Sequence, residues 1–145
     1  MKIDRFVDIQ KEEYQKAFNE IAGGRKISHW MWYIFPQVKG LGSTSTSVYY
    51  GIDGYEEAEE YLNNEYLYNN LVGISKKLLS LETNDPEEVF GYIDAMKLKS
   101  CMTLFSMTQN WSNNLKNEKT DVFDKVIEKY YDGEYDNLTI DILND

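Results

Sequence analysis

The sequence predicts an all-α protein, a single compact domain over residues 1–145 with about five or six helices and at most a short extended piece near residues 43–52. Two observations lead to this prediction. Several stretches place apolar residues three or four positions apart, which is the repeat of a helix buried along one side. Glycine, proline or capping residues separate these stretches. A chain of 145 residues also buries enough surface to fold without a disulfide or a metal.

The first helix is expected over residues 9–22, where the apolar spacing is regular and a Gly-Gly pair follows. Glycine accepts the left-handed conformation that often closes a helix. Residues 28–35 are then expected to form a short helical turn, capped by Ser28 and stopped by Pro36. The alternation of apolar residues over 30–34 would also fit a strand.

A second helix pair is expected in the middle of the chain. Asp53 and Glu56 have the spacing of a capping box, which predicts a helix through Leu62. The apolar residues of 66–81 follow a regular 4-3-4-3 spacing, so this is the clearest helix of the sequence. The acidic side chains of the 53–62 segment are expected to form a solvated face: Glu56, Glu57, Glu59 and Glu60.

Asp85 and Pro86 predict the start of the next helix, with Asp85 as its N-cap. Its apolar face would consist of Phe90, Ile93, Leu98, Cys101, Leu104 and Phe105. Residues 110–119 are polar and predict a loop. Thr120 is expected to cap a further helix that ends just before Gly133, and a last short turn is expected over 137–143.

The chain carries a formal net charge of -10 and has a sequence pI of about 4.6. Such a surface repels both the phosphate backbone of duplex nucleic acid and an anionic membrane, so neither is an expected partner. The chain has one cysteine and one histidine, which excludes a disulfide framework and predicts no metal or other cofactor. The start of the chain has no apolar core of signal-peptide length, so we expect a cytoplasmic protein.

One segment departs from this acidic character. Residues 21–52 contain no Asp or Glu, carry a formal charge of +3, and hold the single histidine, two of the three tryptophans and five of the nine glycines. Residues 90–108 are also poor in acids and carry +1. An acidic protein that keeps two segments cationic and aromatic has a candidate site there for an anion or a flat ring.

The first segment offers several groups that bind anions. Arg25 can contact a phosphate through two parallel hydrogen bonds, and Lys26 adds a second positive charge. If Ser28 begins a helix, the free backbone N–H groups that follow it would also bind an anion. Trp30 or Trp32 could stack against a base or a sugar. The structural alternative is that the aromatic residues belong to the core and Arg25 pairs with one of the chain's many carboxylates.

The second segment places Asp94, Lys97 and Cys101 on one side of the predicted helix, with Ser100 nearby. Lys97 could neutralise a bound anion, with Asp94 beside it. The structural alternative is that Asp94 and Lys97 form an ordinary helix-stabilising pair. Cys101 lies among apolar residues and is expected to be a buried, unreactive thiol.

The same two segments resemble those of a bacterial family known as domain-of-unknown-function family 1810. The motifs that carry the resemblance are residues 24–37 (GRKISHWMWYIFPQ), 40–43 (GLGS), 50–52 (YGI) and 93–105 (IDAMKLKSCMTLF), together with Phe6, Gln10, Tyr14, Val122, Phe123, Tyr130 and Gly133. The resemblance implies a mainly α-helical single domain and favours helix over strand around Trp30. It implies no established activity. Cys101 departs from the family, in which a small residue is usual, and this argues against a thiol nucleophile.

Our leading hypothesis is a pocket between residues 24–43 and the helix of residues 94–105 that binds a small anionic, phosphate-bearing and nucleotide-like ligand. Its binding residues would be Arg25, Lys26, Ser28, Trp30, Trp32, Gln37, Ser43 and Ser100. If the protein is also a hydrolase or transferase acting on this ligand, its catalytic residues would be His29 as general acid or base, with Asp94 and Lys97.

The alternative hypothesis is a protein without catalysis. In this reading the segment Trp30–Phe35 is either a packing hub inside a purely structural module or an exposed anchor for a protein partner. Exposure separates the hypotheses: a hollow lined by cations favours a small ligand, and a flat aromatic patch favours a protein.

Overall fold

The structure, a computed structural model, describes residues 2–145. Of the predicted domain 1–145, Met1 lies outside the described residues. Helices joined by irregular segments make up the described chain. The helices are α1 (Asp4–Ala22), α2 (Met31–Ile34), α3 (Ser45–Tyr49), α4 (Gly54–Asn63), α5 (Glu65–Ser80), α6 (Pro86–Trp111), α7 (Val122–Tyr131) and α8 (Asn137–Leu143).

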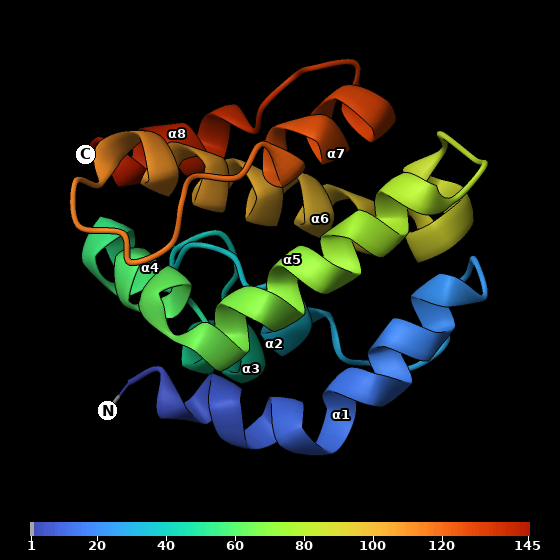
Figure 1. The fold of residues 1–145 in the computed structure, drawn as a ribbon, viewed down its shortest axis with the longest axis horizontal. Helices are drawn as coiled ribbons and strands as arrows, with labels where there is room; N and C mark the ends of the chain where they lie inside the picture. The colour runs from blue at the N-terminus through green and yellow to red at the C-terminus, as the bar shows by residue number, and fades with distance from the viewer. Residues whose placement is uncertain (1) are drawn as a thin grey trace.

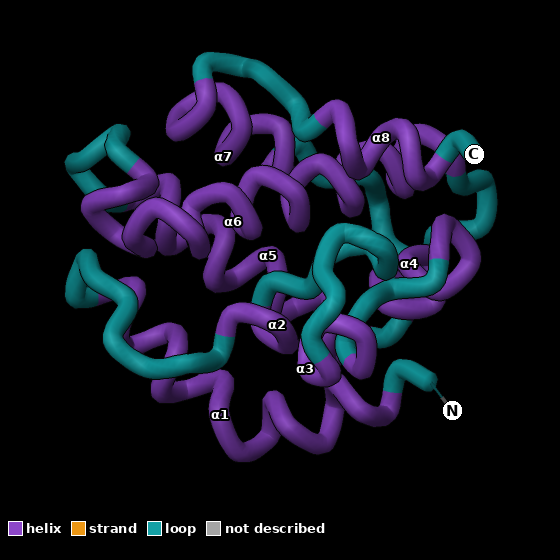
Figure 2. Tube along the Cα trace, turned by 180° about the vertical axis from the view of Figure 1, so that it is seen from behind, coloured by secondary structure: helices purple, strands orange, loops and turns teal. Residues whose placement is uncertain are grey.

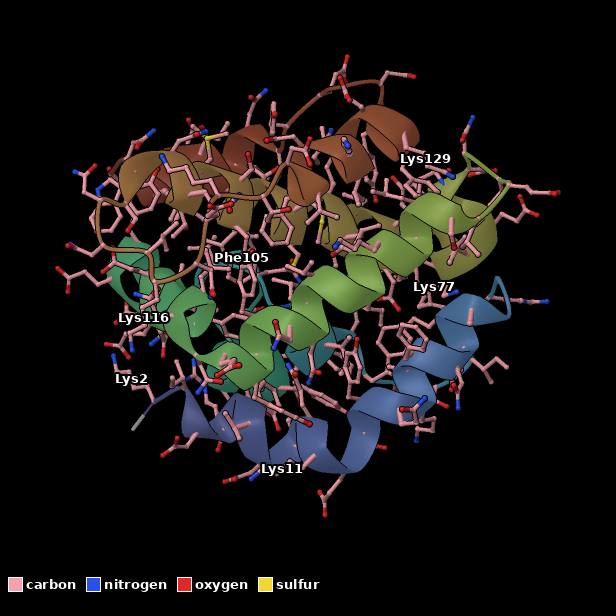
Figure 3. All side chains as sticks on the ribbon, in the orientation of Figure 1. Lys2, Lys11, Lys77, Phe105, Lys116 and Lys129 are labelled. Carbon is pink, nitrogen blue, oxygen red and sulfur yellow. The ribbon has the colours of Figure 1, made fainter. Side chains whose placement is uncertain are left out.

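The helices enclose one hydrophobic core. Helices α6, α7 and α8 run together along one side of the molecule, α1 lies along the opposite side, and α5 crosses between them (Figure 1). Phe105 of α6 is fully buried in the middle of the molecule, whereas the labelled lysines lie at its periphery (Figure 3). The Phe105 ring contacts Tyr61 of α4 and Phe123 of α7, with centroid distances of 5.0 and 6.0 Å. Within residues 2–145, no helix combines the length and the apolar character needed to cross a membrane.

The all-α class is confirmed, but the predicted count of five or six helices is wrong: residues 2–145 form eight. Three of the eight are short, and α3 lies where the sequence predicted a loop with an extended piece. Thr44 explains α3, because its side chain accepts a hydrogen bond from the Ser47 N–H at 3.1 Å and so caps the helix. Extended pairing is limited, in residues 2–145, to one isolated parallel bridge between Val38 and Ile52.

The predicted caps are partly correct. Asp85 caps α6 as expected, accepting a hydrogen bond from the Glu87 N–H at 2.9 Å. Asp53 precedes α4, but its backbone N–H donates to Glu57 at 2.7 Å and not to Glu56. Ser28 does not cap α2, which begins only at Met31.

Gly91 interrupts the regular geometry of α6. Its backbone has φ 77° and ψ 171°, a conformation that is accessible essentially only to glycine. The two parts of α6 on either side of Gly91 are therefore out of phase. Ile93, which the sequence predicted on the buried face, is 67% exposed. It lies five positions before Leu98 in the part of α6 that follows Gly91, and this spacing places it on a different side of the helix.

We expect Gly91→Ala to lower the free energy of unfolding by about 1–3 kcal/mol, because alanine at this φ and ψ is strained whatever space surrounds it. Gly23→Ala is the matched control, since Gly23 has an ordinary φ of -78° and a Cβ there would meet only normal contacts at 3.5 Å. Urea denaturation of both variants measures the difference. Equal stabilities would contradict the assignment of strain to Gly91.

Candidate functional site

A cavity of about 370 Å³ opens between the irregular segment that follows α2 and the helices α6 and α8. Figure 2 shows this side of the molecule, with the irregular segment in front of the helices. We call it the main cavity. It is lined by Trp32, Gln37, Val38, Leu41, Gly42, Ser47, Tyr50, Gly51, Ile93, Met96, Lys97, Lys99, Ser100, Asp136 and Leu138.

Residues 39–51 form one wall of the main cavity, and two backbone hydrogen bonds close the neck of this loop. The Lys39 N–H donates to the Ile52 carbonyl at 2.8 Å, and the Ile52 N–H donates to the Gln37 carbonyl at 2.9 Å. Gly51 is required at this neck, because a Cβ there would lie only 2.9 Å from the Lys39 Cα atom. The close approach of the two chain segments at the neck thus fixes where the wall begins and ends.

Arg5 of α1 holds the same wall from below. Its guanidinium donates to the carbonyls of Tyr49 (2.8 Å) and Gly51 (2.9 Å) and to the Glu57 carboxylate of α4 (2.8 and 3.2 Å). The two charged side chains are nearly buried, at 13% and 5% exposed. Burial alone would raise the pKa of Glu57, but the hydrogen bonds from Arg5 and from the Asp53 N–H lower it below its ordinary value. The prediction of a solvated face is therefore wrong for Glu57.

The opposite wall belongs to α6, and there the two cationic segments of the sequence meet. Asp94 forms ion pairs with Lys26 at 2.9 Å and with Lys97 at 3.5 Å. The Lys97 ammonium in turn lies 4.6 Å from the centre of the Trp32 ring. A chain of contacts thus joins the segment around residues 26–32 to α6.

Lys97 and Lys99 bring positive charge to the main cavity. Lys97 forms an ion pair with Asp94, whereas Lys99 has no carboxylate within 4.0 Å among residues 2–145. The Lys99 ammonium lies 5.9 Å from the centre of the Tyr131 ring. Apolar side chains that are largely exposed surround the mouth: Ile93, Met96 and Leu138. The cavity therefore combines an apolar rim with two ammonium groups.

A shallower depression of about 540 Å³ adjoins the main cavity and shares Trp32, Ile93 and Lys97 with it. We call it the side hollow. The other two predicted catalytic residues line it: His29, which is exposed, and Asp94, which is half-buried. Gly91, with its special conformation, also lies on its wall. The three predicted catalytic residues are thus close together around the side hollow, and only Lys97 also lines the main cavity.

The N–H groups that the sequence offered to an external anion are occupied by a carboxylate of the chain itself. Glu20 of α1 accepts hydrogen bonds from the N–H groups of Ile27 (2.7 Å) and Ser28 (2.8 Å), from the Ser28 hydroxyl (2.7 Å) and from the indole N–H of Trp30 (2.9 Å). Burial works to raise the pKa of Glu20, but these hydrogen bonds outweigh it and lower the pKa to about 2. Ser28 and the fully buried Trp30 are therefore away from the main cavity.

The remaining predicted binding residues separate into two groups. Trp32, Gln37 and Ser100 line the main cavity, and Lys26 lines the side hollow. Arg25 is exposed beside a different depression that Lys16, Asn19 and Glu20 border, and Ser43 does not line the main cavity. Cys101 is fully buried, and burial raises the pKa of its thiol well above the ordinary value, which fits an unreactive core residue.

Asp136 lines the main cavity and was missed by sequence reasoning. Its Oδ2 atom accepts hydrogen bonds from the hydroxyls of Ser100 (2.8 Å) and Thr139 (2.6 Å), and its backbone N–H donates to Thr103 at 2.9 Å. The chain has 25 acidic residues, and no local pattern sets this one apart. Only the packing of α8 against α6 brings it to the cavity.

Comparison with known proteins gives two positive findings. The model of a family described as "Protein of unknown function (DUF1810)" matches residues 1–143. The crystal structure of the conserved hypothetical protein Rv1873 from Mycobacterium tuberculosis is similar, with a TM-score of 0.90 and 36% sequence identity over 99% of this chain and 96% of that chain. No curated protein matches the chain significantly.

Proposed function

Because the chain belongs to the DUF1810 family of proteins of unknown function, we propose its function from the cavity itself: it binds a small anionic molecule with a flat ring, of the phosphate-bearing, nucleotide-like kind. The observation that supports this most is the meeting of Lys97, Lys99 and Trp32 around one cavity in a chain of net charge -10. Its volume of about 370 Å³ falls within the range of small-molecule sites, about 300–1,000 Å³.

The residues divide the recognition between them. Lys97 and Lys99 hold the phosphate through charge-assisted hydrogen bonds. Trp32 provides the flat surface for the ring, since aromatic side chains favour offset stacking. The side-chain amide of Gln37 has no hydrogen-bond partner among residues 2–145 and is free to bind a polar group of the ligand. Arg25 has no part in this arrangement.

A chemical step on the ligand would take place at the side hollow. His29, Asp94 and Lys97 line it, and histidine is the side chain that titrates nearest neutral pH. A ligand held at Lys97 would lie next to all three, because Lys97 belongs to both depressions. Release of phosphate or of a base from a bound nucleotide, abolished by His29→Ala, would support hydrolysis.

A second candidate is docking of a protein at the mouth of the main cavity. Ile93, Met96 and Leu138 are 57–67% exposed there, and such an apolar patch is typical of interaction surfaces. The segment Trp30–Phe35 does not supply the exposed anchor, because Trp30, Met31, Tyr33, Ile34 and Phe35 are all buried. It serves as a packing hub.

A thermal-shift screen against nucleotides and sugar phosphates tests the small-ligand proposal. A ligand at 100 times its dissociation constant stabilises the fold by about 2.7 kcal/mol. Lys99→Gln and Lys97→Gln are expected to weaken binding of such a ligand about tenfold or more, since each removes a hydrogen bond to a charged group.

Two matched controls accompany these variants. Lys76→Gln makes the same charge change at an exposed position of α5, and Arg25→Ala removes a cation outside the main cavity. Both are expected to bind as the unaltered protein does. No stabilisation by any compound, or equal losses in Lys99→Gln and Lys76→Gln, would overturn the proposal.

A further inference from the structure

Asp136 gives the main cavity a negatively charged hydrogen-bond acceptor, which a simple anion would not bind. Asp136 belongs to the same lining as Lys97 and Lys99, so an acidic residue stands among the cations of the cavity. None of the lysines lies within 4.0 Å of Asp136 in residues 2–145, so no ion pair neutralises this carboxylate. An anionic group placed against Asp136 would be repelled. The ligand must therefore offer Asp136 something other than its phosphate.

The two oxygens of Asp136 are used differently. Oδ2 accepts the hydroxyl hydrogens of Ser100 and Thr139, which fixes the orientation of the carboxylate. Oδ1 has no hydrogen-bond partner among residues 2–145, and every buried side-chain oxygen of that part of the chain has one. It follows that Oδ1 is accessible from outside. A carboxylate oxygen only accepts hydrogen bonds, and its two lone pairs can accept two.

The group that fits Oδ1 is a neutral donor. An ammonium group on the ligand would be repelled by Lys97 and Lys99, whereas hydroxyl groups carry no charge and donate to a carboxylate. Two neighbouring hydroxyls can use both lone pairs of Oδ1 together. A carboxylate that binds ribose hydroxyls beside a phosphate site is a known solution in nucleotide-binding folds of another type.

We infer that Asp136 recognises vicinal hydroxyls of a sugar, so that the ligand of the main cavity is a ribose phosphate, free or within a nucleotide. This inference rests on the proposed function, because it assumes that Lys97 and Lys99 hold the phosphate. Asp136 then sets the distance between phosphate and diol and selects ribose over deoxyribose.

Isothermal titration calorimetry tests the inference. The ligands are ribose 5-phosphate and the four ribonucleoside 5′-phosphates, each compared with its 2′-deoxy counterpart. The 2′,3′-dideoxy forms of the nucleotides are measured as well. The ribo forms are expected to bind about tenfold or more tightly than the 2′-deoxy and the dideoxy forms, because each of these lacks at least one hydrogen bond to a charged acceptor. Equal affinities of ribo and dideoxy forms would overturn the role of Asp136 and leave the proposed function standing. Absence of binding by all of them would overturn both.

Variants locate the preference. Asp136→Asn is expected to lower the affinity for ribo forms to that for dideoxy forms and to leave dideoxy binding unchanged. Asp141→Asn is the matched control: it makes the same substitution at an exposed position of α8 that does not line the main cavity, so the ribo preference is expected to persist. A preference that survives in Asp136→Asn would assign it to another residue. If Asp136→Asn does not fold, the comparison of ligands on the unaltered protein decides alone.

Discussion

Replacing Glu20 with alanine is expected to lower the free energy of unfolding by about 3–4 kcal/mol. The change removes four hydrogen bonds and leaves the indole N–H of Trp30, a side chain with 0% exposure, without a partner. An orphaned buried donor costs about 1–3 kcal/mol, and hydrogen bonds to a charged acceptor are stronger than average. Urea denaturation at neutral pH measures the loss.

Glu20→Gln separates charge from geometry. Its amide oxygen can still accept from the three N–H groups that contact Oε1, so we expect a smaller loss, about 1–2 kcal/mol. Equal losses in Glu20→Ala and Glu20→Gln would mean that the carboxylate charge is the whole effect. A negligible loss in both would show that the segment after α1 is held by other contacts.

The low pKa of Glu20 also gives the sign of a pH effect. Its value in the folded protein is about 2, against an ordinary 4.5. A lowered folded-state pKa stabilises the protein above about pH 4.5, and this contribution disappears as the pH falls toward 2. Because solvent screens a partly exposed carboxylate, we expect about 1–2 kcal/mol from this group. Denaturation curves at pH 7, 4 and 2.5 should show that Glu20→Gln lacks this part of the decrease.

Arg5→Met is expected to lower the free energy of unfolding by about 3–4 kcal/mol. It is also expected to loosen the wall of the main cavity that residues 39–51 form. The substitution leaves the nearly buried Glu57 carboxylate without its ion-pair partner, and breaking a buried pair on one side costs about 3–5 kcal/mol. It also releases the carbonyls of Tyr49 and Gly51, which flank the cavity residue Tyr50. Any ligand found in the screen should therefore bind more weakly to this variant.

The double variant Arg5→Met with Glu57→Gln provides the control for this prediction. Because it removes the uncompensated charge, it is expected to be more stable than Arg5→Met alone, which a double-mutant cycle measures as coupling. Additive losses would show that Arg5 acts only through its backbone contacts. Lys125→Met serves as a comparison, since its pair with Asp121 is exposed and contributes little.

The fold was largely predictable because a helix that is buried along one side has regularly spaced apolar residues in its sequence. The spacing of residues 66–81 predicted α5 within one residue at each end, and Asp85-Pro86 predicted the start of α6. The phase break inside α6 was not predictable, because a glycine within a helical pattern does not reveal its φ. The helix α3 was missed because five residues are too few to show a period.

The meeting of the two cationic segments was predictable, but the contacts of their side chains were not. Charge and aromatic content indicated that residues 24–43 and the helix of residues 94–105 belong together, and the ion pair of Lys26 with Asp94 joins them. The sequence could not tell that Glu20, in the preceding helix, accepts hydrogen bonds from the N–H groups that were predicted to bind an anion. Nor could it select Asp136 among 25 acids, since contacts over 36 positions leave no local pattern.

Because the neck of residues 39–51 is closed by hydrogen bonds, the segment between its ends can be replaced by another sequence without moving those ends. The hydrogen bonds at the neck, and those from Arg5 to Tyr49 and Gly51, end on backbone atoms of the wall, so they make few demands on the side chains between them. The α6 wall lacks this freedom because its other face packs in the core. We therefore expect that replacing residues 40–50 with longer or shorter loops changes the size of ligand that the cavity accepts.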